Sequence, residues 1–232
     1  MTPRAHRFPL ETARLEALDR GLAESIGARL SGLTTSPAPY IIHMLGIPGA
    51  GKTTFARALH PKLSRTDQPE PLYLSFDDIM STIPGYARDP DPVAAHARYE
   101  LSARTAGYHL LRQALAMRAS ILFDHGGANP DHVSILEYAR NGLDYKTAVI
   151  YIPCEPEIAA ERIEKRSANE GRHTPPHYIE ERTFLIEKLL PAYVKLSDAF
   201  FTLKPSQTQL ECADIFAEIA IAVNCIRAPD SN

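Results

Sequence analysis

The sequence has no tryptophan, only three cysteines and no apolar run that approaches the length of a membrane-spanning helix. Such a helix needs about 20 consecutive apolar residues, and the first residues also lack the apolar segment of a secretory signal peptide. Cys154, Cys212 and Cys225 form no C-x-x-C pair, so neither a disulfide framework nor a cysteine-based zinc site organises this chain. We therefore expect a cytoplasmic protein with reduced thiols and no membrane partner.

An excess of charge of one sign is also missing. Lysine and arginine together number 25 against 28 aspartates and glutamates, which gives a net charge of −3 at pH 7. Proteins that bind nucleic acid usually carry a clustered positive field, so a nucleic-acid partner is not expected. At 232 residues, 44% hydrophobic and 23% charged, the composition is typical of a soluble globular protein that buries one core.

The stretch GIPGAGKT, residues 46–53, fits the phosphate-loop (P-loop) pattern G-x-x-x-x-G-K-[ST] at every fixed position. A β-branched apolar run at 40–45 precedes it, and apolar residues at helical spacing follow at 54–60, up to Pro61. Strand, glycine loop and helix N-terminus form an anion site, because backbone N–H groups converge there. We predict ATP and Mg²⁺ as cofactors, with Lys52 on the phosphates and the Thr53 hydroxyl on the metal. The predicted cofactor-binding residues of this loop are Gly46, Pro48, Gly49, Ala50, Gly51, Lys52, Thr53 and Thr54.

Carboxylates end two further predicted strands. The run at 72–76 leads into Asp77 and Asp78, and the run at 120–124 closes with Asp124. In an open α/β sheet the carboxyl ends of the strands face the ligand crevice. We assign the catalytic base to Asp77, and a helix cap beside the substrate to Asp78, although the two roles are interchangeable by sequence. Asp124 is predicted to support Mg²⁺ or to contact the acceptor, and a turn-stabilising aspartate is the alternative.

The loop after Asp124 begins with His125, Gly126 and Gly127. Adjacent glycines let backbone approach a ligand closely, so His125 and Gly126 are candidate substrate contacts. The ordinary pKa of histidine suits acid–base work. A structural hydrogen-bonding role is the alternative that we favour for His125.

Three arginines bracket a glycine- and proline-bearing lid between two predicted helices. Transfer of a phosphoryl group needs cations on its oxygens, and guanidinium groups suit them. Arg166 and Arg172 are therefore predicted catalytic residues, and Arg162 a cofactor-binding residue. Surface ion pairs or helix-dipole partners are the alternative. On the long predicted helix at 93–118, one of the charged residues is expected to reach the acceptor: Arg98, Glu100, Arg104 or Arg112.

Strands alternate with helices along the chain. Predicted strands at 40–45, 72–76, 120–124, 146–152 and 199–203 give a five-stranded parallel sheet covered on both faces, an α/β fold. We expect the helix at 93–118 to be continuous or broken near Gly107, and Asp131 to cap the next helix.

A kinase domain is expected at 40–203. It follows an N-terminal helical extension and linker at 1–39 and precedes a C-terminal helix and tail at 204–232. The N-terminal helix is expected to pack on this domain, and binding of a partner protein is the alternative. Its apolar face comprises Leu15, Leu18, Leu22, Ile26 and Leu30.

The P-loop, the SFDD motif after the second strand, Asp124 and the arginine lid together resemble the zeta-toxin and polynucleotide-kinase-like family of P-loop kinases. The resemblance covers about residues 40–203. It implies a three-layer sandwich with sheet order 2-3-1-4-5, and the catalytic aspartate would be Asp77. Two departures concern the acceptor side. The sequence has Asp124-His125-Gly126 where zeta toxins tend to carry Glu-x-Thr. It also has Met80 at the position where an arginine often follows the aspartate motif of the second strand.

The combined prediction is an ATP- and Mg²⁺-dependent kinase acting on a hydroxyl of a small, nucleotide-like acceptor. The resemblance implies a UDP-N-acetylhexosamine, a nicotinamide dinucleotide or a similar molecule. A polynucleotide or nucleoside 5′-hydroxyl kinase is one alternative, although the acidic net charge disfavours it. The other is a nucleotide-gated switch, in which hydrolysis controls a partner or inhibitor protein held by the terminal helices.

Overall fold

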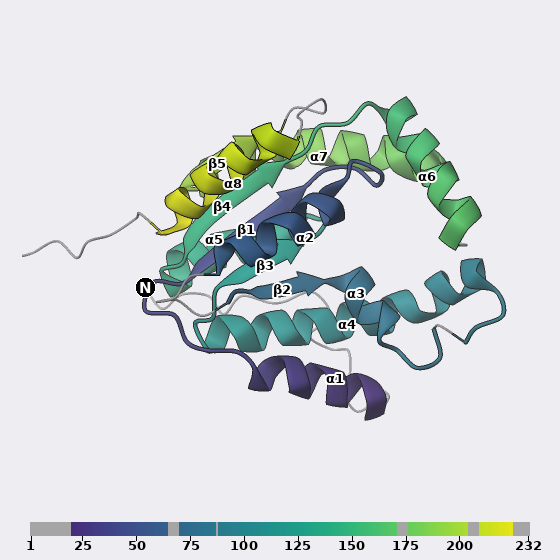
Figure 1. Cartoon of the computed structure of the whole chain (residues 1–232), viewed down its shortest axis with the longest axis horizontal. Coiled ribbons are helices and arrows are strands. Elements are labelled where there is room, and N and C mark those ends of the chain that lie inside the picture. The colour runs from purple at the N-terminus through teal and green to yellow at the C-terminus, as the bar shows by residue number, and fades with distance from the viewer. Residues whose placement is uncertain (1–19, 65–69, 87, 171–175, 204–208, 225–232) are drawn as a thin grey trace, which may run out of the picture.

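The computed structural model describes residues 20–64, 70–86, 88–170, 176–203 and 209–224 (Figure 1). Five parallel strands form one sheet in the order β2-β3-β1-β4-β5, which confirms the predicted fold class and strand order. The strands are β1 (Tyr40–Leu45), β2 (Leu72–Ser75), β3 (Ile121–Asp124), β4 (Lys146–Tyr151) and β5 (Ala199–Thr202). Every residue of the central strand β1 is buried, as expected for an apolar run covered on both faces.

Helices cover both faces of this sheet (Figure 1). Within the described residues they are α1 (Arg20–Ser31), α2 (Lys52–Leu63), α3 (Phe76–Ser81), α4 (Pro92–Ala116), α5 (Pro130–Leu143), α6 (Pro156–Glu170), α7 (Pro176–Leu196) and α8 (Gln209–Asn224). None of these helices is both long and apolar enough to span a bilayer.

Alternate side chains of β1 face two separate cores, as the period of two along a strand requires. Ile41 and Leu45 pack with residues of α1, α3, α4 and α5 on one face. Ile42 and Met44 pack with residues of α2, α6 and α8 on the other face. Helix α7 contributes to both cores. The result is the predicted three-layer sandwich with added helices at each end of the chain.

The terminal helices pack on the sandwich. In α1, which lies against α4, Ile26 is buried and Leu30 joins the same core, as predicted. Leu15 and Leu18 lie outside the described residues. Helix α8 packs against α2 and β4 through Ile219. The domain boundaries at 39/40 and 203/204 stay predictions.

Two helix ends differ from the prediction. Helix α2 does not stop at Pro61 but continues to Leu63, because the proline lies on the exposed side of the last turn, where it removes only one intrahelical hydrogen bond. Asn129, not Asp131, caps α5: its side chain accepts a hydrogen bond from the Asp131 N–H at 3.1 Å, and Pro130 takes the first helical position.

Helix α4 is continuous through Gly107. The residue is buried, and a Cβ placed on it would lie 2.4 Å from the Phe76 ring. Glycine is therefore needed here for close packing of α4 against the start of α3 and not for a helix break. This contact also holds the residue that directly precedes Asp77.

Replacing Gly107 with alanine is expected to destabilise the protein by about 1–3 kcal/mol, as overpacking of a core does. The intrinsic helix preference runs the other way, because alanine favours a helix by about 1 kcal/mol over glycine. The matched control is Gly27→Ala in α1, where an added Cβ meets no atom within 4 Å. Urea denaturation that finds Gly107→Ala as stable as Gly27→Ala would contradict the close packing.

Candidate active site

The P-loop joins β1 to α2 at the carboxyl edge of the sheet. Gly49 and Gly51 have φ values of 83° and 94°, which L-residues with a side chain rarely adopt. A Cβ on Gly49 would also lie 2.6 Å from the Ala159 carbonyl oxygen of α6. Gly51 is the N-cap of α2, and no side chain caps the helix there. The first N–H groups of α2 are thus left for an anionic ligand.

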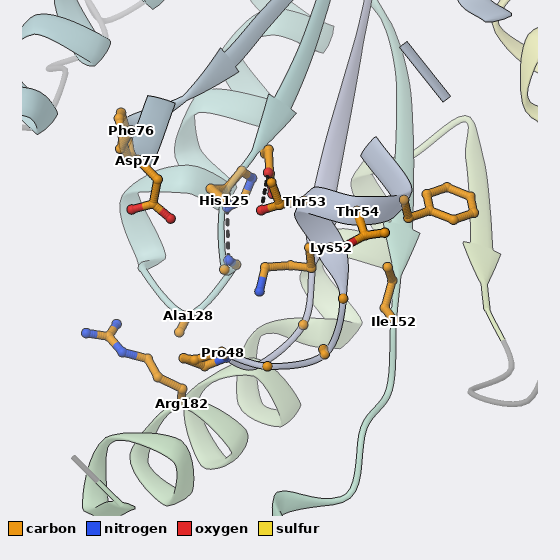
Figure 2. A pocket seen from close by; sticks show the side chains of 18 of the residues that line it. Pro48, Lys52, Thr53, Thr54, Phe76, Asp77, His125, Ala128, Ile152 and Arg182 are labelled. Atoms are coloured by element: carbon orange, nitrogen blue, oxygen red, sulfur yellow. Dashed lines mark hydrogen bonds between the residues drawn. The ribbon is translucent and has the colours of Figure 1, made fainter. Parts of the chain in front are cut away.

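Lys52 extends from the P-loop into a cavity (Figure 2). Its Nζ donates a hydrogen bond to the Ile47 carbonyl at 2.9 Å. Burial lowers the pKa of Lys52, and the negative charges of Asp124 and Asp77 oppose that shift. The lysine therefore lies within electrostatic reach of both predicted functional carboxylates.

Asp124 ends β3 directly beside the start of α2. Its Oδ2 accepts hydrogen bonds from the Thr53 hydroxyl at 2.8 Å and from the Tyr73 hydroxyl at 2.9 Å. Burial raises the pKa of Asp124, while the charge of Lys52 and the two hydroxyl donors act in the opposite direction. Tyr73, on β2, was not identified from the sequence, since a tyrosine in a strand is usually a packing residue.

Thr53 and Asp124 fit a magnesium ion, which prefers oxygen ligands and is usually held by one or two protein groups together with substrate phosphates and water. Within the described residues no group of three or more histidine, cysteine, aspartate or glutamate side chains could form a protein cage for a metal.

Asp77 lies in the first turn of α3 and its carboxylate points into the cavity, on the side of Lys52 (Figure 2). The pairing register explains this position, because Ser75 at the end of β2 lies opposite Asp124 of β3. The strands carrying these carboxylates thus end at the same level. Asp77 also acts electrostatically on both Lys52 and Asp124.

Asp78 does not lie with the other predicted residues. It forms an ion pair with Arg57 at 2.7 Å and is not among the side chains that line the cavity. Nor does it cap α3: Ser75 is the N-cap, and its hydroxyl accepts from the Asp78 N–H at 3.3 Å. The predicted cap was therefore wrong, and the predicted substrate contact of Asp78 stays a prediction.

Gly126 and His125 line the cavity, but both ring nitrogens of His125 are used inside the protein. Nδ1 accepts a hydrogen bond from the Gly127 N–H at 2.9 Å, and Nε2 lies 2.8 Å from His43 Nδ1. Because Nδ1 is an acceptor, Nε2 carries the ring proton and donates a hydrogen bond to His43 Nδ1. The structural role that the sequence left open accounts for His125, and its predicted substrate contact is not supported.

His125 belongs to a buried cluster with His43 and His132. The ring centroid of His125 lies 4.7 Å from that of His43 and 4.2 Å from that of His132. Burial lowers the pKa of His43 to about 3. Burial and the neighbouring histidines also hold the pKa values of His125 and His132 well below the ordinary 6.5. All three rings are neutral in the folded protein at pH 7.

This cluster predicts acid-sensitive stability. The folded-state pKa values lie below the unfolded ones, so below about pH 6.5 the unfolded chain binds protons that the folded chain does not. The free energy of unfolding is therefore highest above about pH 6.5, and we expect it to fall by a few kcal/mol between pH 7.5 and 5.5. Urea unfolding at both pH values measures it. His132→Gln removes one titrating site and should make the loss smaller; an unfolding free energy that does not change with pH contradicts the account.

Both predicted arginines of α6 that the structure describes, Arg162 and Arg166, line the cavity. Arg166 of α6 lines the cavity, and its charge opposes protonation of Lys52, which places it near the P-loop. Arg162 is exposed, and its Nη1 donates to the Gly49 carbonyl at 3.2 Å. Arg172 lies outside the described residues. Arg182 of α7 also lines the cavity; sequence spacing did not identify it.

One cavity of about 1340 Å³ connects these groups. Typical small-molecule pockets measure about 300–1,000 Å³, so this cavity has room for more than one ligand. Its P-loop end is extended by apolar residues of α2, the β4–α6 connection and α8: Phe55, Ile152 and Phe216. Its opposite end is formed by α3, α4, α5 and α7 and includes Asp77, Arg104, His132 and Arg182.

The sequence matches the family described as zeta toxin over residues 23–197, and no curated protein matches it. Among solved structures, it is similar to one from a study of the PezAT chromosomal toxin–antitoxin system of Streptococcus pneumoniae (14% identity, 87% of this chain and 91% of that chain, TM-score 0.60). It is also similar to AvrRxo1-ORF1:-ORF2 with ATP (12% identity, 91% and 73%, TM-score 0.62). A shikimate kinase from Acinetobacter baumannii in complex with shikimate is a third (20% identity, 83% and 97%, TM-score 0.50). These structures share the fold, and the match over residues 23–197 covers most of the chain. The chain therefore belongs to the zeta-toxin family.

Proposed function

We propose that this protein is an ATP- and Mg²⁺-dependent kinase that transfers the γ-phosphoryl group to a hydroxyl of a small nucleotide-like acceptor, such as a UDP-N-acetylhexosamine or a nicotinamide dinucleotide. The observation that carries the proposal is the shared cavity, in which the Asp77 carboxylate and the P-loop with Lys52 lie together (Figure 2). Membership of the zeta-toxin family and the P-loop fold support an ATP-using kinase.

The P-loop end of the cavity would hold ATP. Backbone N–H groups at the start of α2 would bind phosphate oxygens, with Lys52 as the nearby cation. Thr53 and Asp124 would hold the metal, and a bound Mg²⁺ supplies neutralisation of phosphate charge. Because the Thr53 hydroxyl donates its proton to Asp124, its lone pairs stay available for a cation.

The opposite end would hold the acceptor, with its hydroxyl between Asp77 and the γ-phosphate. In the transfer the hydroxyl oxygen bonds to phosphorus, the bond from phosphorus to the bridging oxygen of ADP breaks, and the hydroxyl proton passes to Asp77. Arg166 would neutralise charge on the transferred group. Asp124 is a poorer base for this step, since both Thr53 and Tyr73 already donate to one of its oxygens.

A protein partner is part of the proposal. One similar structure comes from a toxin–antitoxin system, and a second pairs two gene products, ORF1 and ORF2. By analogy we propose that this chain is controlled by an inhibitory protein at its terminal helices and acts in the cytoplasm.

Labelled ATP tests the proposed function. The protein is incubated with [γ-³²P]ATP, Mg²⁺ and a panel of UDP-sugars, nicotinamide dinucleotides, nucleosides and oligonucleotides, with EDTA replacing Mg²⁺ in a control. Label that moves to a small acceptor only with Mg²⁺ supports the kinase. Label on oligonucleotides favours the 5′-hydroxyl kinase, and free phosphate alone favours the nucleotide-gated switch.

A further inference from the structure

Two arginines, Arg104 and Arg182, line the acceptor end of the cavity. Helix α4 presents Glu100 and Arg104 to it, one turn apart, with the Arg104 Nη1 and a Glu100 carboxylate oxygen 3.1 Å apart. Burial raises the pKa of Tyr108, and the nearby charge of Arg104 opposes that shift; the Tyr108 hydroxyl lies 2.8 Å from His132 Nε2. Arg104 thus lines the cavity with its charge partly balanced by Glu100.

Arg182 adds a second cation from the facing helix α7. Its guanidinium carbon lies 4.2 Å from the centroid of the Tyr178 ring, one turn earlier in the helix. This stacking fixes the side chain where it borders the cavity, on the side of Asp77 (Figure 2). Burial lowers the pKa of His132, and the charges of Arg104 and Arg182 act in the same direction, so Arg182 lies within electrostatic reach of α5 as well.

Arg166 and Arg182 therefore act in different parts of the cavity. The charge of Arg166 acts on Lys52 of the P-loop, whereas the charge of Arg182 acts on His132 at the other end. A cation for the transferred phosphoryl group accounts for Arg166. Arg182 has no such role in the proposed reaction.

The surroundings of Arg182 lack a balancing anion. Among the described residues no carboxylate lies within ion-pair distance of it, and its Nε is buried without a hydrogen-bond partner. His132 is neutral because burial lowers its pKa, so it does not balance the positive charge of the Arg182 guanidinium. A partly buried cation beside a ligand cavity is stabilised when the ligand brings the opposite charge.

We propose that Arg182, assisted by Arg104, binds an anionic group of the acceptor, a phosphate or a carboxylate, and that Arg182 thereby determines acceptor specificity. This inference rests on the proposed kinase function, because the bound molecule is an acceptor only if the protein transfers a phosphoryl group to it. It assigns the recognition of charge to residues of α4 and α7, whereas the P-loop, Asp77, Asp124 and Arg166 carry the transfer itself.

Binding of matched ligand pairs tests the assignment. The full chain is saturated with Mg²⁺ and the non-hydrolysable analogue AMP-PNP, so that the P-loop end is filled. Calorimetry then compares UDP-N-acetylglucosamine with N-acetylglucosamine, nicotinamide adenine dinucleotide with nicotinamide riboside, and gluconate with glucose. The variant is Arg182→Met, and the control is Arg112→Met, an exposed arginine of α4 outside the cavity lining.

We expect the wild-type protein and Arg112→Met to bind the anionic member of at least one pair about tenfold or more tightly than the partner that lacks an anionic group, as charge-assisted hydrogen bonds do. Arg182→Met should lose that preference while its AMP-PNP affinity stays unchanged. Preference in the first two pairs identifies a phosphate, and in the third a carboxylate. A preference that survives in Arg182→Met, or none in the wild-type protein, overturns the proposal. If the preference depends on Arg182 yet no bound molecule accepts label from ATP, the anion site stands and the kinase proposal fails.

Discussion

Replacing Asp77 with asparagine is expected to slow phosphoryl transfer about 10²–10⁴-fold, the range that a positioned general base contributes. The amide keeps the shape of the side chain but cannot take the acceptor proton. ATP binding should persist or become slightly tighter, because the variant removes a negative charge that acts on the site of Lys52. Single-turnover transfer at saturating ATP, together with ATP binding by calorimetry, measures both effects.

The neighbouring residue supplies the control for this experiment. Asp78→Asn makes the same chemical change one position along α3, but Asp78 pairs with Arg57 outside the cavity. We expect its transfer rate to stay within a few-fold of the wild-type rate, as for an exposed ion pair of small energetic value. Near-normal transfer in Asp77→Asn, or a larger loss in Asp78→Asn, would show that the base lies elsewhere.

Replacing Lys52 with methionine is expected to lower transfer by about 10²–10³-fold, comparable to the loss of one preorganised group that stabilises transition-state charge. Methionine fills similar space without the ammonium group. Its loss also leaves Asp124 and Asp77 without the cation that acts on them, so the melting temperature of the nucleotide-free protein should fall as well. Single-turnover transfer and thermal unfolding measure the two effects separately.

Lys165→Met is the control for the lysine experiment. Lys165 is exposed and pairs with Glu161 one helical turn away, at 2.6 Å, and it is not among the side chains that line the cavity. Both transfer and melting temperature should stay close to wild type, since exposed pairs of this kind contribute about 0.3–0.5 kcal/mol. A Lys52→Met variant that behaves like Lys165→Met would mean that the P-loop lysine has no part in transfer.

The parts of the site that sequence predicts are those set by short-range pattern. The P-loop has fixed spacing within eight residues, 46–53, and flanking runs of the right period place it between a strand and a helix. Asp77 and Asp124 followed from one rule, that carboxyl ends of parallel strands share an edge. The fold class followed from the alternation of predicted strands and helices, and the strand order followed from the family resemblance.

The parts that sequence could not predict depend on which helix face meets the cavity. Arg182 lies among charged residues on a helix whose pattern indicates only an apolar core face, and its approach to His132 depends on the packing of α7 against α5. Tyr73 reaches Asp124 because neighbouring strands β2 and β3 pair in register. The Asp78 side chain pairs with Arg57 of helix α2. This contact depends on how the helices pack and cannot be predicted from a local sequence pattern.

The central claim is that one cavity brings the terminal phosphate of ATP to a hydroxyl beside Asp77. The most direct test uses ATP labelled with ¹⁸O in its γ-phosphoryl group, mixed with a small-molecule extract of cells, Mg²⁺ and the wild-type or the Asp77→Asn protein. We predict that mass spectrometry finds a metabolite carrying a heavy-oxygen phosphate group with the wild-type protein, and none with Asp77→Asn over the same time. Heavy oxygen found only in free inorganic phosphate, in equal amounts with both proteins, would contradict the claim.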